Sequence, residues 1–101
     1  SPALDIIRLL QLKGAEVRYH DPHVAMIVDD GHTSIQGLPL HSDPLTDQLL
    51  RSQDLVVIVT DHAEVDYVRV LREAPLVLDT RGVLRGPGGG KLVTLSGVAK
   101  G

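Results

Sequence analysis

The stretch DLVVIVT, residues 54–60, decides the fold. Residues 55–59 are all apolar and mostly β-branched, a pattern typical of a strand that is buried on both faces of a parallel sheet. We therefore expect this strand in the middle of the sheet. Because ligands of open α/β sheets bind beyond the carboxyl ends of the strands, Thr60, Asp61 and His62 lie where binding or chemistry would occur.

The composition supports a core of this kind. The chain has 101 residues, of which 43% are hydrophobic and 23% are charged, and this balance predicts one folded domain rather than a disordered segment. Phe and Trp are absent and the aromatic residues are Tyr19 and Tyr67, so the core must consist of Leu, Val, Ile and Ala. Aliphatic strands packed on aliphatic helix faces are typical of α/β proteins.

Charge and cysteine content exclude several functions. A net charge of −3 and a pI near 5.9 predict no nucleic-acid partner and no anionic membrane surface, since such binders carry a basic stripe. The absence of cysteine excludes disulfides, thiolate nucleophiles and cysteine zinc sites. No apolar run approaches the roughly 20 residues of a membrane span, and the first residues, SPALD, do not resemble a signal peptide. We expect a soluble, cytoplasmic protein.

The N-terminal part predicts a helix followed by an edge strand. Apolar residues recur at helical spacing over residues 2–13, Ser1 and Pro2 suit a helix start, and Gly14 suits its end. Residues 15–20, AEVRYH, alternate in polarity and predict a strand nearer a sheet edge.

The next segment is the least regular. A short strand, VAMIV, fits within residues 23–30, and the Gly and Pro residues of 31–44 predict a loop or hairpin. Ser42 or Asp43 can cap a helix that continues to about Gln53.

The C-terminal part continues the alternation of helices and strands. A helix over about 63–73, stopped by Pro75, and a buried strand over 76–78 follow the first strand. GPGGG, residues 86–90, is linker-like, and KLVTLSGV, residues 91–98, predicts one more strand.

This order of elements predicts an α/β fold. We expect a single domain over residues 1–101, with a Rossmann-like or flavodoxin-like three-layer sandwich and a mainly parallel sheet of four or five strands.

Three segments together resemble a known family. SPALDIIRLLQLKGAEVRYHDPHV, DLVVIVTDH and PLVLDTRGVL are similar in order and spacing to the C-terminal nucleotide-sugar-binding domain of the UDP-glucose/GDP-mannose dehydrogenase family, over roughly residues 1–24 and 43–85. Family members oxidise the sugar C6 hydroxyl with NAD, and their catalytic Cys and Lys lie in other regions. The resemblance implies that this chain binds the UDP part of a UDP-sugar and holds no catalytic residue and no NAD. The remainder of a parent dehydrogenase is then its partner, and the chain alone is a monomer.

One departure from the family suggests a circular permutation. The family domain begins with a strand of the form VLGLAYKP, whereas here SPAL comes first and the tail, residues 91–101, resembles that strand. We hypothesise that GPGGG joins the old C-terminus near Arg85 to the old first strand, which places the tail strand centrally, between 15–20 and 55–60. The alternative is that the tail is the family's own C-terminal strand in a truncated chain.

Three residues are candidates for UDP binding. Arg81, in DTRG, follows a strand end, where a guanidinium suits a base carbonyl or a phosphate, and the resemblance implies that it contacts the nucleotide. The alternative is a surface Arg paired with Asp79. Lys100 resembles a family Lys that reaches the nucleotide, although it lies one residue from the chain end. Asp21 lies where Rossmann domains keep a ribose-binding acid, but Asp21-Pro22 is also an ordinary turn.

Other motifs give weaker signals. Asp61 and His62 fit either a general base pair or caps of the following helix, with Asp61 accepting from amides near Glu64, and we favour caps. His20 and His23 have a spacing that rarely aims both rings at one ion, so we predict no metal site. GPGGG lacks the Lys-Ser/Thr of a phosphate loop.

The leading functional hypothesis is an isolated nucleotide-sugar-binding domain of an NAD-dependent UDP-sugar 6-dehydrogenase, not catalytic alone. Two alternatives remain open. One is an engineered or truncated folding fragment with no ligand function, and the other is a small flavodoxin-like binding module.

Overall fold

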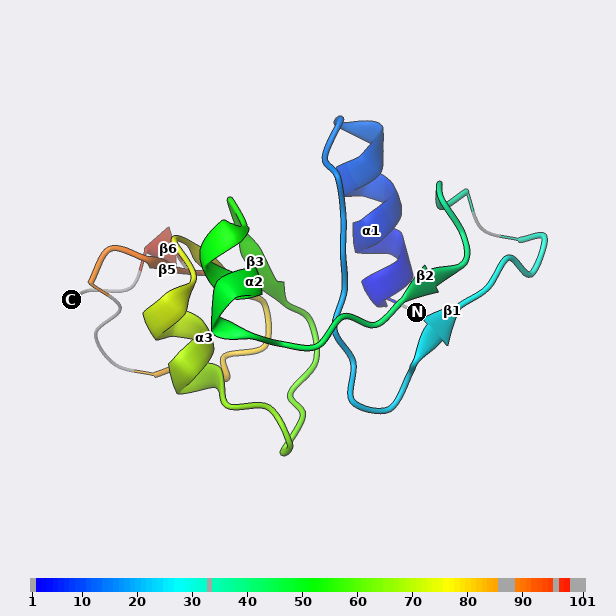
Figure 1. The fold of residues 1–101 in the computed structure, drawn as a ribbon. Helices are drawn as coiled ribbons and strands as arrows, with labels where there is room; N and C mark the ends of the chain where they lie inside the picture. Colours follow the sequence, from blue (N-terminus) through cyan, green and yellow to red (C-terminus); the bar gives the residue numbers. More distant parts are fainter. Residues whose placement is uncertain (1, 33, 86–88, 96, 99–101) are drawn as a thin grey trace. The chain divides into compact units, whose positions relative to one another are not determined.

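The structure is a computed structural model that describes residues 2–32, 34–85, 89–95 and 97–98 (Figure 1). It divides into two compact units, residues 1–44 and 45–101, and each is described by itself. The expectation of a single domain over residues 1–101 stays a prediction.

The first unit contains one helix and a small antiparallel pair of strands. Helix α1, Pro2–Leu12, confirms the predicted helix, and Gly14 follows it with a φ of 92°, a left-handed conformation that glycine adopts without steric cost. Strand β1, Met26–Ile27, pairs antiparallel with β2, Leu40–His41, which confirms a short strand in VAMIV and a hairpin after it.

The predicted strand over residues 15–20 is wrong. In the described part of the first unit this segment makes one isolated parallel bridge, between Tyr19 and Ser42. Side chains fix it instead: the Arg18 guanidinium donates to the Asp43 carboxylate at 2.9 and 3.1 Å, and His20 Nδ1 lies 2.7 Å from the Asp43 carbonyl oxygen. Because Asp43 is engaged by Arg18, it does not cap the following helix.

The second unit holds the main sheet. Its elements are α2, Asp47–Ser52; β3, Val56–Ile58; α3, Tyr67–Glu73; β4, Val77–Asp79; β5, Leu92–Thr94; and β6, Gly97–Val98. The strands lie in the order β3-β4-β5-β6, with β3, β4 and β5 parallel and β6 antiparallel to β5. The predicted α/β class and a mainly parallel sheet are confirmed.

The predicted strand order is wrong. β3 was expected in the middle, but it lies at an edge of the four-stranded sheet. The tail strand β5 pairs with β4 instead of with residues 55–60. In this pairing Leu92 is buried beside its register partner Val77, and the Val77 amide donates to the Lys91 carbonyl oxygen at 2.8 Å. The circular permutation depended on pairing between the tail and residues 55–60, so it gains no support from the sheet.

The starts of both helices in the second unit differ from the prediction. Thr46 Oγ1 accepts from the Leu49 amide at 3.1 Å and caps α2, in place of Ser42 or Asp43. Asp66 Oδ1 accepts from the Arg69 amide at 3.1 Å and caps α3. Helix α3 therefore begins at Tyr67 rather than near residue 63.

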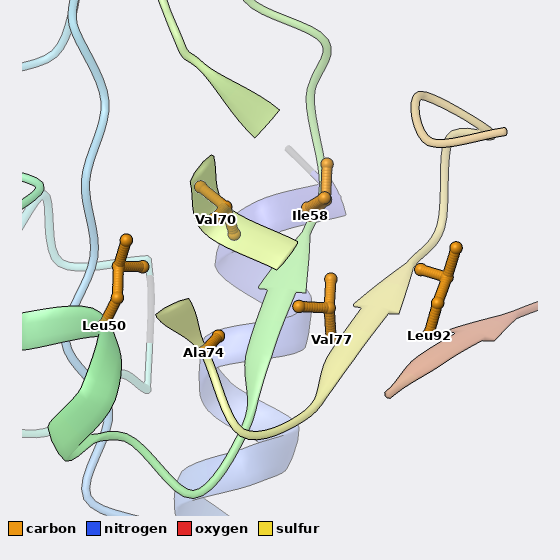
Figure 2. Close-up of a cluster of buried hydrophobic side chains, with 6 residues drawn as sticks. All are labelled: Leu50, Ile58, Val70, Ala74, Val77 and Leu92. Carbon is orange, nitrogen blue, oxygen red and sulfur yellow. The ribbon is translucent and has the colours of Figure 1, made fainter. Parts of the chain in front are cut away.

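A single aliphatic cluster forms the core of this unit. Figure 2 shows its six buried side chains, which come from α2, from α3 and its C-cap residue, and from strands β3, β4 and β5. They are Leu50, Ile58, Val70, Ala74, Val77 and Leu92. Helices α2 and α3 thus cover one face of the sheet, and full burial of each large aliphatic side chain contributes about 1.5–3 kcal/mol. Val68 lies outside this core, since it is 70% exposed on α3.

Ion pairs connect the two covering helices. Arg69 Nη1 lies 2.7 Å from Asp47 Oδ1, and Arg51 pairs with Glu73. Hydrogen bonds from these arginines lower the pKa of both carboxyl groups below their usual range. The pairs are at the surface, so they fix how the helices meet more than they add to stability.

Candidate functional site

The carboxyl ends of β4 and β5 lie side by side and border a hollow. Asp79 ends β4 and Thr94 ends β5, and the two residues are register partners in the parallel sheet. A hollow of about 390 Å³ is lined by Asp79, Thr80, Gly82, Thr94 and Leu95. Ligands of parallel α/β sheets bind at this end of the strands, so the hollow is the candidate binding site.

The buried carboxylate of Asp79 holds the loop beyond β4. Asp79 is 1% exposed, and its Oδ1 accepts from the Arg81 amide at 3.0 Å while its Oδ2 accepts from the Leu84 amide at 2.8 Å. Burial by itself raises the pKa of Asp79, but hydrogen bonds from backbone amides, chiefly that of Leu84, outweigh it and lower the pKa. The ionised side chain thus acts as a fixed scaffold for residues 80–84.

Thr80 attaches the same loop to the neighbouring strand. Its hydroxyl donates to the Ile58 carbonyl oxygen at 2.6 Å, and its amide donates to the same oxygen at 3.1 Å. Gly82 has a φ of 67°, a conformation that a side chain would strain. The loop is therefore fixed at both ends, and the backbone that lines the hollow is preorganised.

Arg81 belongs to the loop beyond β4 that borders this hollow, but it is not one of the residues that line it. Its side chain is exposed, and the residues on either side of it, Thr80 and Gly82, both line the hollow. Its contact with Asp79 runs through the backbone amide. Within the described ranges, no carboxylate lies within ion-pair distance of the Arg81 guanidinium, so the predicted alternative of an Arg81–Asp79 ion pair is not what the geometry shows.

A tyrosine that the sequence did not single out fixes the loop beyond β3. Tyr67 Oη accepts from the His62 amide at 2.7 Å and donates to the Thr60 carbonyl oxygen at 2.7 Å. Burial raises the pKa of the Tyr67 phenol. The predicted cap at Asp61 is wrong, because Asp66 caps α3 and the phenol binds the His62 amide.

Asp21 occupies a turn in the first unit. Its Oδ1 accepts from the amides of His23 and Val24 at 2.7 and 3.1 Å, and its own amide donates to Ser42 Oγ at 3.0 Å. These contacts are those of an ordinary Asx turn, and a ribose-binding role for Asp21 stays a prediction. Lys100 lies outside the described residues. The predictions of no metal and no NAD in this chain also stay predictions.

A second hollow, of about 280 Å³, lies against α2. It is lined by Thr46, Gln48, Leu49 and Ser52. Its hydroxyl groups serve the helix itself: Thr46 caps the helix start, and Ser52 Oγ donates to the Leu49 carbonyl oxygen at 2.7 Å.

One comparison with known proteins identifies a family. A family model described as the UDP binding domain of the UDP-glucose/GDP-mannose dehydrogenase family matches residues 1–86. No curated protein and no solved structure matches the chain significantly. Among the described residues, none of the helices has the length and apolar character needed to cross a bilayer.

Proposed function

The chain belongs to the UDP-glucose/GDP-mannose dehydrogenase family as its UDP-binding domain, and from this membership we propose that it binds the UDP part of a UDP-sugar at the hollow beside Asp79. The sugar-oxidising chemistry then belongs to the remainder of a parent dehydrogenase, which supplies the NAD site. This chain has no cysteine and so cannot supply a thiol nucleophile.

The observation that carries the proposal is the position of Arg81. An exposed guanidinium follows a strand end, on a loop that Asp79 and Thr80 hold through hydrogen bonds. The planar fork of N–H donors on Arg matches the oxygens of a diphosphate in a bidentate way. Because the loop is already fixed in the free protein, little ordering entropy opposes binding.

Further parts of the proposal follow from the family. Lys100 and Asp21 are the other two residues that we assign to the nucleotide. The protein acts in the cytoplasm, and the isolated chain is a monomer.

The test is calorimetric titration of the 101-residue chain with UDP. A charge-assisted hydrogen bond is worth roughly 1.5–3 kcal/mol, so Arg81→Ala should weaken UDP binding by about tenfold or more. Arg85→Ala removes the same charge from an exposed position four residues further along the loop, and it should change the affinity by less than about twofold.

Two results would contradict the proposal. An equal loss in the Arg81 and Arg85 variants would mean that only general charge matters. No binding at millimolar UDP would instead favour a truncated or engineered folding fragment without ligand function.

A further inference from the structure

The hollow has a second wall that lies beyond the family match. The matched region ends at residue 86, whereas β5 spans Leu92–Thr94. Thr94 and Leu95 line the hollow together with the loop beyond β4. Two of the five lining residues therefore come from the tail, beyond the region that matches the family.

The β4 side of the hollow, formed by Asp79, Thr80 and Gly82, is its first wall, and it contains a charged side chain, whereas Thr94 and Leu95 of the tail wall are uncharged. The buried Asp79 carboxylate borders the hollow and remains ionised at neutral pH, because its hydrogen bonds from backbone amides lower its pKa. A diphosphate placed over this carboxylate would be repelled, and more strongly than in bulk water because the carboxylate is buried. The uncharged part of a nucleotide meets no such cost there.

The tail also supplies the groups that an uncharged nucleoside needs. Leu95 is 78% exposed at the edge of the hollow, so its side chain offers an apolar surface to a planar base. Thr80 and Thr94 carry hydroxyl groups on the same lining. The Thr80 hydroxyl donates to the Ile58 carbonyl oxygen, but a hydroxyl oxygen that donates within the protein can still accept from a ribose hydroxyl or a base N–H group. Arg81, on the loop between Thr80 and Gly82, is left for the phosphates.

We infer that the tail strand forms the nucleoside-binding wall of the site: base and ribose lie against Leu95 and Thr94, and the diphosphate extends to Arg81. This inference rests on the proposed function and assigns a ligand-binding role to residues outside the family match. The fold places the tail correctly for this role because β5 extends the parallel sheet beside β4, so that Thr94 lies next to Asp79.

The test compares Leu95→Ser with Val68→Ser in calorimetric titrations with UDP at several salt concentrations. Val68 is the matched control, since it is an apolar residue of the same unit that is 70% exposed on α3 and does not line the hollow. Leu95→Ser should weaken UDP binding about fivefold, the value expected when a few tens of Å² of apolar surface no longer become buried. Val68→Ser should leave the affinity unchanged within about twofold.

The salt dependence of UDP affinity distinguishes the contribution of the tail wall from that of Arg81. The affinity of Leu95→Ser should fall with salt as steeply as that of the wild type, whereas Arg81→Ala should respond less to salt because a charged contact has been removed. If Arg81→Ala weakens UDP binding and Leu95→Ser does not, the nucleoside wall is wrong and the proposed function stands. If the unchanged protein does not bind UDP at all, the nucleoside wall and the proposed function are both wrong.

Discussion

Asp79 and Thr94 are register partners at the carboxyl ends of two adjacent parallel strands, and they are 15 residues apart in sequence. One belongs to the segment that matches the dehydrogenase family and the other to the tail beyond it. Their pairing brings two parts of the chain, separated by GPGGG, to the lining of a single hollow. The candidate site is thus a product of sheet topology rather than of one motif.

Replacement of Asp79 by Asn should destabilise the second unit at neutral pH. The two carboxylate oxygens accept from the amides of Arg81 and Leu84, and an Asn side chain has only one acceptor oxygen. One backbone donor then loses its partner, at a cost of about 1–3 kcal/mol. Urea unfolding followed by far-UV circular dichroism measures the loss. Asp54→Asn, at an exposed position of the same unit, should change the free energy of unfolding by less than about 0.5 kcal/mol.

The same carboxylate predicts a pH dependence. The folded-state pKa of Asp79 is lowered, so its contribution to stability is present above the unfolded-state pKa of about 3.9 and is lost as the pH falls through the folded-state pKa. The difference in free energy of unfolding between the wild type and Asp79→Asn should therefore shrink below about pH 4. A difference that stays constant from pH 7 to pH 3 would contradict this role.

The cap of α3 gives a paired test of the loop geometry. Asp66 Oδ1 accepts from the Arg69 amide, so Asp66→Ala should lower the free energy of unfolding by about 1 kcal/mol. Asp61→Ala removes the same charge from the preceding loop without removing the cap and should cost no more than a few tenths of that value. Equal losses in the two variants, measured by urea unfolding, would show that the helix starts elsewhere.

The class of the fold could be predicted because its signals are local. The β-branched run at 55–59 and the helical spacing of residues 2–13 each encode one element, and both elements form. The absence of Phe and Trp correctly predicted an aliphatic core.

Strand order could not be predicted because an apolar run does not specify its neighbour. The run at 55–59 suits a central strand and an edge strand equally well, and β3 forms at the edge of the described sheet. The tail was expected beside β3, but Leu92 fills the core next to Val77, on the other side of β4.

The predicted starts of α2 and α3 were wrong for a related reason. Several Ser, Thr and Asp residues precede α2 and α3, and long-range contacts decide which of them caps each helix. Asp43 is engaged by Arg18, which leaves Thr46 as the cap of α2. The phenol of Tyr67 binds the His62 amide, and Asp66 rather than Asp61 caps α3.

Only part of the candidate site could be predicted from the sequence. Arg81 follows from the rule that ligands bind at the carboxyl ends of parallel strands, and it lies between Thr80 and Gly82, which line the hollow; its role in binding stays a prediction. Thr94 and Leu95 could not be predicted, because their proximity to Asp79 depends on the pairing of β4 with β5 across the linker.

The most direct test of the central claim is to locate UDP on the protein by amide chemical shifts in a ¹⁵N-labelled sample of the 101-residue chain. We predict that the largest changes on addition of UDP fall on residues at the carboxyl ends of β4 and β5, namely Arg81, Gly82, Thr94 and Leu95. Changes confined to the hollow beside α2, at Gln48, Leu49 and Ser52, or no changes at millimolar UDP, would contradict the account.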